Sequence, residues 1–174
     1  MTPVWSHTIQ LESVARGVQQ VDLVADVVTL AAIAKFLDVP GISDLRANLS
    51  VRAWLDGAEI TGRFSAVVTQ VCGVSLEEFE QKVVGRLDVR AVPSGSPHAI
   101  DEAVASDVEF DSEAADPPDV LDGQTLDLAV YLVEQLALEL DPFPRKPGVE
   151  FQPPEPETDT SPFAVLRQLK GNLT

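Results

Sequence analysis

Apolar and polar residues alternate along three consecutive runs in the middle of the chain, and this period of two predicts β-strands. The alternate positions of the first run are all apolar: Leu45, Ala47, Leu49, Val51, Ala53 and Leu55. The second run continues from Ile60 to Val68, and the third from Val83 to Ala91. Between the first two lies Asp56-Gly57, a tight-turn signal in which glycine accepts the positive φ of a hairpin. We therefore predict an antiparallel meander with one buried face.

The residues before this meander predict two further strands and a helix. Residues 5–11 alternate, and residues 18–25 resemble a second strand. Asp26 is placed to cap a helix whose apolar residues recur at helical spacing, and Pro40-Gly41 should end it. This helix is short and amphipathic, so we expect it to lie on the sheet.

A second main helix is predicted towards the end of the chain. It is capped by Thr125 or Asp127 and runs to about Leu140, where Asp141-Pro142-Phe143-Pro144 ends it. Most of its sides are apolar, so we expect it in the core, with a place under a partner as the alternative. The fold class is therefore α+β, with an antiparallel β-sheet or partly closed barrel, two main helices and a short C-terminal helix.

The composition divides the chain into segments. We expect a single α+β domain over 1–144, with a flexible acidic loop near 94–122. Residues 145–161 are rich in Pro and Glu and form a linker, and 162–174 form a C-terminal helical motif. A helix of that length is marginal in water, so it should dock on this domain or on a partner.

Negative charge gathers in the second half of the chain. The formal net charge is −16. Residues 1–90 carry eight basic and eleven acidic side chains, whereas residues 91–174 carry four basic and seventeen acidic ones. Such a field repels phosphate and attracts basic surfaces. The alternative is that these carboxylates only keep the chain soluble.

The basic residues of the first half fall on the opposite side of the predicted strands from the apolar ones. A sheet face lined with arginine can contact a phosphate backbone. Among aromatic residues that might stack on bases, only Trp54 lies nearby. The alternative is an ordinary solvated face, or one covered by the acidic half. The candidate RNA-facing residues are Arg46, Arg52, Arg63, Arg86 and Arg90.

Motifs of known enzyme chemistry are missing from the sequence. It has no glycine-rich phosphate loop, no His-Glu-x-x-His and no Cys-x-x-Cys. Cys72 is the only cysteine, and His7 and His98 lie in different settings, so we expect no catalytic residue, no metal site and no cofactor. The start of the chain has no signal-peptide pattern and no apolar run is long enough to span a bilayer, so we expect a cytoplasmic location without a membrane partner.

The order of several short motifs resembles a known family. Residues 68–77 follow the antiparallel core and contain Cys72-Gly73-Val74-Ser75. After the acidic loop come residues 126–128, then residues 138–145 and residues 161–166. This arrangement is similar to the YceD family of large ribosomal RNA subunit accumulation proteins, most closely to its alphaproteobacterial-type members. The residues that carry it are Cys72, Leu76, Glu77, Asp127, Pro142, Pro144 and Arg145.

The resemblance implies a part in the accumulation or processing of 23S ribosomal RNA. It also implies a shared pathway with a small basic protein of the large subunit, whose gene commonly neighbours family genes. Many relatives carry Cys-x-x-Cys where this chain has Cys72 and Ser75, so a metal or redox role of that motif is not expected here.

Together these features predict a non-catalytic factor that binds a basic large-subunit ribosomal protein through its acidic second half. Direct binding of 23S rRNA through the arginine face is the alternative. A metal-dependent hydrolase is a third and weaker one, and no small-molecule substrate is expected. The candidate partner-binding residues are Asp107, Glu109, Asp111, Phe163 and Leu166.

Overall fold

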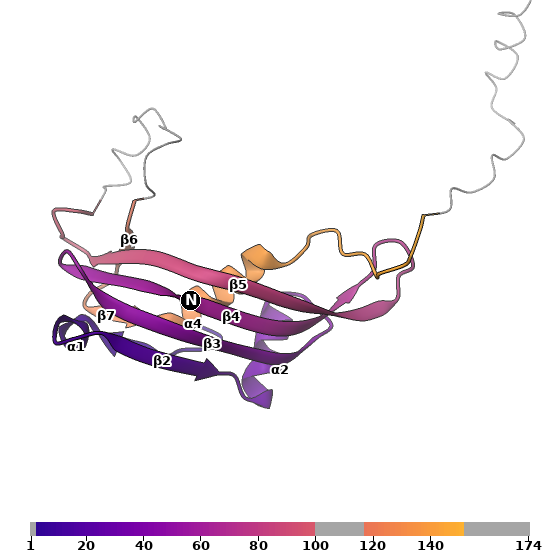
Figure 1. The fold of residues 1–174 in the computed structure, drawn as a ribbon, viewed down its shortest axis with the longest axis horizontal. Helices are drawn as coiled ribbons and strands as arrows, with labels where there is room; N and C mark the ends of the chain where they lie inside the picture. The colour runs from indigo at the N-terminus through magenta and orange to yellow at the C-terminus, as the bar shows by residue number, and fades with distance from the viewer. Residues whose placement is uncertain (1–2, 100–116, 152–174) are drawn as a thin grey trace, which may run out of the picture.

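The computed structural model describes residues 3–99 and 117–151. Its elements follow the chain in the order β1 (Thr8–Gln10), α1 (Leu11–Ala15), β2 (Gln19–Val24), α2 (Val27–Phe36), β3 (Gly41–Trp54), β4 (Gly57–Val71), β5 (Glu78–Pro93), β6 (Asp119–Leu121), β7 (Thr125–Asp127) and α4 (Leu128–Glu139). The α+β class is confirmed. Figure 1 shows one long twisted sheet with α2 and α4 behind it.

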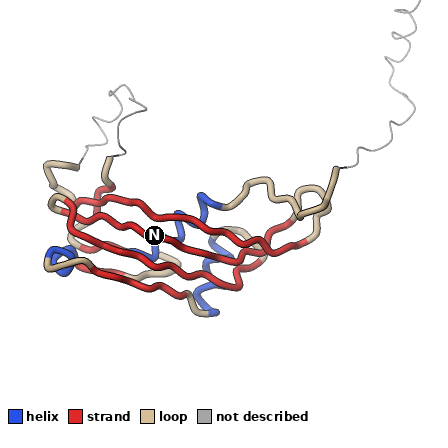
Figure 2. Tube along the Cα trace, viewed as in Figure 1, coloured by secondary structure: helices blue, strands red, loops and turns tan. Residues whose placement is uncertain are grey.

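The main sheet has five strands in the order β2-β3-β4-β5-β6, and β6 is parallel to β5 while the other pairs are antiparallel. The strands β1 and β7 form a separate antiparallel pair. Because β2 and β6 are opposite edges of the sheet, the described strands form an open, mixed sheet and not a closed barrel. The predicted meander corresponds to β3, β4 and β5 and is confirmed (Figure 2).

The hairpin between β3 and β4 is present, but its chemistry differs from the prediction. Trp54 pairs with Gly57, so the two turn residues are Leu55 and Asp56. The positive φ belongs to Leu55, at 53°. Gly57 is required for a different reason, because a Cβ there would lie 2.0 Å from the carbonyl oxygen of Ala91 on β5.

The inner face of the sheet is the side that carries the core. The alternation of the first run is confirmed at Leu45, Ala47, Leu49 and Val51, all of which are buried. The prediction was wrong for the last two positions, since Ala53 and Leu55 are exposed. Ala53 lies past the segment of β3 that β2 covers, and Leu55 is in the turn.

Both main helices are capped by the expected aspartates. The Asp26 side chain accepts a 2.8 Å hydrogen bond from the Thr29 N–H at the start of α2. This helix ends at Phe36, and Asp38 takes a positive φ before Pro40 is reached. The Asp127 side chain accepts from the Ala129 N–H of α4.

Helix α4 packs in the core, as its apolar sequence predicted. Its residues Leu128, Leu132 and Leu136 are fully buried. No helix in 3–99 or 117–151 has the length and apolar character needed to cross a bilayer.

The N-terminal strand is shorter than expected. Only Thr8–Gln10 pair with β7, and α1 begins at Leu11, because Leu11 and Val14 both turn into the core at helical spacing.

The strand predicted over 18–25 is confirmed as β2. A short strand, β6, occurs in the segment predicted to be an acidic loop. The predicted C-terminal helix lies outside the described residues.

Candidate functional site

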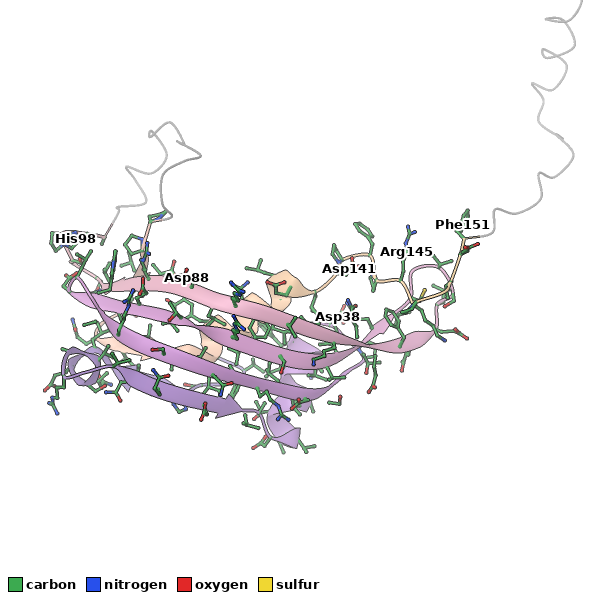
Figure 3. The ribbon with its side chains drawn as sticks, in the orientation of Figure 1. Asp38, Asp88, His98, Asp141, Arg145 and Phe151 are labelled. Atoms are coloured by element: carbon green, nitrogen blue, oxygen red, sulfur yellow. The ribbon has the colours of Figure 1, made fainter. Side chains whose placement is uncertain are left out.

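Two segments far apart in the sequence meet at one end of the sheet. One is the turn of residues 72–77 between β4 and β5, and the other is the segment 141–146 after α4. The Gly73 N–H donates a 2.8 Å hydrogen bond to the carbonyl oxygen of Pro144. The Lys146 ammonium lies 2.9 Å from a Glu77 carboxylate oxygen. We call this contact region the junction, and Figure 3 shows Asp141 and Arg145 at this end of the sheet.

The turn of the junction is built around Cys72. Its N–H donates to the carbonyl oxygen of Glu77, and its carbonyl oxygen accepts from the Leu76 N–H, both at 2.9 Å. Leu76 takes a φ of 61°, in the left-handed region, and its side chain is 77% exposed. The backbone of Val74 and Ser75 donates two N–H groups towards the Cys72 sulfur, each at 3.4 Å.

These donors set the acidity of the thiol. Hydrogen bonds from the Ser75 side chain, followed by backbone N–H groups of Ser75 and Lys146, lower the pKa of Cys72 to about 6, although burial opposes this. A pKa near 6 favours the thiolate form at neutral pH, in a residue that is fully buried. No group of three or more His, Cys, Asp or Glu side chains suited to a metal occurs within the described ranges.

The Gln70 side chain connects the end of β4 to the segment 141–146. Its Nε2 donates a 3.2 Å hydrogen bond to the Asp141 carbonyl oxygen. Its Oε1 is buried and has no partner among the described residues. The Asp141 carboxylate in turn accepts from the Phe143 N–H, which fixes the bend after α4. Phe143 is 78% exposed, so the junction presents two large apolar side chains, Leu76 and Phe143.

The junction brings together most of the sequence-predicted family residues, namely Cys72, Leu76, Glu77, Pro142, Pro144 and Arg145. Asp127 is not part of it. Its carboxylate accepts from the Ser6 hydroxyl and the His7 N–H while capping α4, so it connects the N-terminal segment to that helix.

The five predicted arginines do share one side of the sheet. This outer face, opposite the core, carries Arg46 and Arg52 on β3, Arg63 on β4, and Arg86 and Arg90 on β5. Three of the five are paired with the protein's own carboxylates. The Arg46 guanidinium forms a 2.9 Å ion pair with Asp44. The other two, Arg52 and Arg90, both bind Glu59.

Glu59 lies between its two arginines because Arg52, Glu59 and Arg90 are direct cross-strand neighbours. Its side chain is only 4% exposed. The Arg52 hydrogen bond, ahead of Arg90, holds the pKa of Glu59 below its ordinary value, and partial burial opposes this. Arg90 also lies over the Trp54 ring, 5.5 Å from its centroid, so the one nearby aromatic platform is already occupied.

Glu59 is a residue of this face that was not predicted from the sequence. Its position in the strand puts it on the outer face, but its contacts depend on the register of β3, β4 and β5.

Arg63 and Arg86 differ from the other arginines: they face each other across β4 and β5 and are both exposed. On β3, the residue that pairs with Arg63 is Asn48. Its side-chain amide donates a hydrogen bond to Asp22, so Asn48 does not pair with Arg63 as a charged partner. Among the described residues, the arginines of the outer face without an ion pair are Arg63 and Arg86, with Lys82 on the same strand as Arg86.

The candidate partner-binding residues Asp107, Glu109, Asp111, Phe163 and Leu166 lie outside the described residues.

Comparison with known proteins identifies the family. The chain matches the family model described as large ribosomal RNA subunit accumulation protein YceD over residues 60–170. No curated protein and no solved structure matches it. The matched region contains both segments of the junction together with β5 and α4. It covers more than half of the sequence, and the chain therefore belongs to the YceD family, whose name describes a role in the accumulation of large-subunit ribosomal RNA.

Proposed function

We propose that this protein is a non-catalytic factor of large-subunit assembly that holds a basic ribosomal protein. The family name gives the process, accumulation of large-subunit rRNA. The chain contributes a strongly anionic second half, with a net charge of −13 over residues 91–174. A surface of that charge attracts a basic partner quickly and releases it at higher salt.

The observation that carries this proposal is the pairing of Glu59 with both Arg52 and Arg90. Together with the ion pair between Arg46 and Asp44, it engages three of the five arginines of the outer face with two of the protein's own carboxylates. The nearby carboxylate partly cancels the attraction of such an arginine for a phosphate. The electrostatics therefore favour a basic protein over a nucleic acid as the direct target.

The exposed apolar side chains of the junction provide a second contact. Leu76 and Phe143 are both more than three quarters exposed, and they lie on segments anchored by Gly73, Pro144 and the Glu77–Lys146 pair. Exposed apolar residues on a fixed backbone suit a protein interface. The proposed partner thus meets an acidic surface and a small apolar anchor, in the cytoplasm where ribosomes are assembled.

A pull-down at low and high salt tests the proposal. The tagged protein should retain a basic large-subunit protein at low salt and lose most of it at high salt. Recovery of no ribosomal protein under either condition would contradict the proposal. A less acidic variant of the same length, with the acidic residues of 101–116 changed to their amides, is the matched control and should bind more weakly.

Direct rRNA contact is the second candidate, and one observation favours it. Arg63 and Arg86 are adjacent, exposed and on a rigid sheet. Two arginines can position a phosphate, although base stacking would need an aromatic surface that Trp54 does not offer while Arg90 covers it. Gel-shift titrations with 23S rRNA fragments at several salt concentrations would detect such binding.

A further inference from the structure

The sheet has a long open edge along β5. Of the described strands, only β6 lies beyond β5, and it pairs with just Ala91, Val92 and Pro93. The rest of this 16-residue strand, from Glu78 to Arg90, has no neighbour on that side within residues 3–99 and 117–151. The opposite edge strand, β2, has only six residues. Backbone groups on a long edge are ready to pair with another strand.

The direction of each backbone group along this edge follows from the β6 pairing. The Ser94 N–H donates to the Leu121 carbonyl oxygen on β6. Because successive residues of a strand point their backbone groups to opposite neighbours, even-numbered residues of β5 face the open edge and odd-numbered residues face β4. The residues with backbone groups at the edge are Glu78, Glu80, Lys82, Val84, Arg86, Asp88 and Arg90.

Helix α4 runs below this edge in the opposite direction to β5. A Cβ on Gly85 would approach Glu139, near the helix end, to 3.1 Å. Near the helix start, Tyr131 lies close to Asp119, which pairs with Ala91 at the far end of β5. In Figure 1 the end of α4 emerges from behind β5 on the side of its open edge. A strand added here would therefore lie over the helix flank.

Negative charge is crowded along this side of α4. Partial burial, followed by the nearby Asp119 charge, raises the pKa of Glu134 and also that of Tyr131. A hollow of about 450 Å³ lies at the β6 end of the edge, and its lining includes Asp88 and Asp119 together with Arg90. The Arg90 guanidinium in this lining is hydrogen bonded to Glu59, and Asp88 and Asp119 are the two carboxylates that can meet an incoming cation.

We propose that the open edge of β5 binds an extended segment of a basic protein as an additional strand, with a lysine or arginine of that segment entering the hollow between Asp88 and Asp119. This inference rests on the proposed function and specifies where and how the partner is held. Strand addition combines backbone hydrogen bonds, which give affinity, with side-chain positions that give specificity. A second copy of this chain is disfavoured because it would bring two chains of net charge −16 together.

The substitution Val84→Pro tests this directly. The Val84 N–H faces the open edge, and its side chain is 62% exposed, so proline removes an edge donor and blocks the approach without breaking the β4 ladder. Val84→Thr keeps the N–H and is the matched control. Circular dichroism and thermal melting establish that both variants fold. The probe is the protein mixture extracted from purified large ribosomal subunits.

The expected result is retention of a basic ribosomal protein by wild type and Val84→Thr, with binding about tenfold weaker for Val84→Pro. On binding, hydrogen exchange should slow at the even-numbered amides Val84, Arg86 and Asp88 but stay unchanged at Val83 and Leu87, which already face β4. Equal binding by all three, without this alternating protection, would overturn the inference and leave the proposed function standing. Retention of nothing by wild type would overturn both. If the alternating protection from hydrogen exchange appeared without added ribosomal protein and increased with the concentration of this chain, the edge would bind a second copy. That result would also overturn the inference.

Discussion

The backbone N–H of Gly73 donates a 2.8 Å hydrogen bond to the carbonyl oxygen of Pro144. This bond joins the turn after β4 to the segment after α4. Both segments lie in the region that matches the YceD family model, and the Glu77–Lys146 ion pair strengthens the same connection. Two of the short motifs that carry the family resemblance, residues 68–77 and 138–145, are therefore connected in the structure, although each is weak as a separate sequence signal.

The Cys72 thiolate should make the stability of this unit depend on pH. Its pKa is lowered from 9.0 to about 6 in the folded protein, so its stabilising effect is complete above the unfolded value and is lost as pH falls through about 6. In urea unfolding, the advantage of wild type over Cys72→Ala should therefore increase between about pH 6 and pH 9. A constant difference over that range would contradict the thiolate assignment.

The serine variant is the control for volume and polarity. Ser cannot ionise in this range. The difference in the free energy of unfolding between Cys72→Ser and Cys72→Ala should therefore stay constant between about pH 6 and pH 9. If Cys72→Ser instead followed wild type, another group would be responsible for the titration.

Removing the Glu59 charge should release two arginines on the outer face. Glu59→Gln is expected to lower the free energy of unfolding by about 1–2 kcal/mol, because charge-assisted hydrogen bonds to Arg52 and Arg90 weaken. Since the pKa of Glu59 is lowered, this difference should vanish as pH falls below its ordinary value of 4.5. Urea titrations at several pH values measure it.

The same variant should bind 23S rRNA fragments more tightly than wild type and with a steeper salt dependence. Asp88→Asn is the control, since it removes one negative charge from the same face at an exposed position. If both variants changed RNA affinity equally, net charge alone would account for the effect, and the blocking role of Glu59 would be wrong.

Reversing the two free arginines separates the candidate functions. The double change Arg63→Glu and Arg86→Glu should leave binding of the basic protein intact, or tighten it by up to about tenfold at low salt. Arg46→Glu is the control, because Arg46 is already paired with Asp44. A loss of basic-protein binding in the double variant alone would show that the outer face contacts the partner.

Gly57 should be intolerant of any side chain. Gly57→Ala would push a Cβ to within 2.0 Å of the Ala91 carbonyl oxygen, so we expect a loss of more than about 2 kcal/mol in the free energy of unfolding. Gly41→Ala, whose Cβ would meet nothing closer than 3.6 Å, is the matched control and should change little. Chemical denaturation of both variants decides this, and similar stabilities would contradict it.

The features that the sequence predicted correctly are those that local pattern determines. The meander follows from a period of two, the Asp26 cap from the chemistry of a helix start, and the core position of α4 from apolar residues on most of its sides. The outward position of Arg46, Arg52 and the other arginines follows from the same alternation. None of these requires knowledge of which strand lies beside which.

The features that escaped prediction depend on register and on close approach. Glu59 binds Arg52 and Arg90 only because three strands align these positions. The φ of Leu55 and the need for glycine at Gly57 depend on how tightly the hairpin lies against β5. Likewise Leu11 continues the alternation of residues 5–11, yet the chain turns into α1 there because Val14 can also be buried.

The central claim is that the direct target is a basic protein, and cross-linking in living cells tests it most directly. A tagged chain would be cross-linked chemically to proteins and by ultraviolet light to RNA, and both kinds of adduct would be identified. The account predicts that a basic large-subunit ribosomal protein dominates the adducts and that Glu59→Gln increases the RNA fraction. Adducts with 23S rRNA alone, at the same level in wild type and Glu59→Gln, would contradict it.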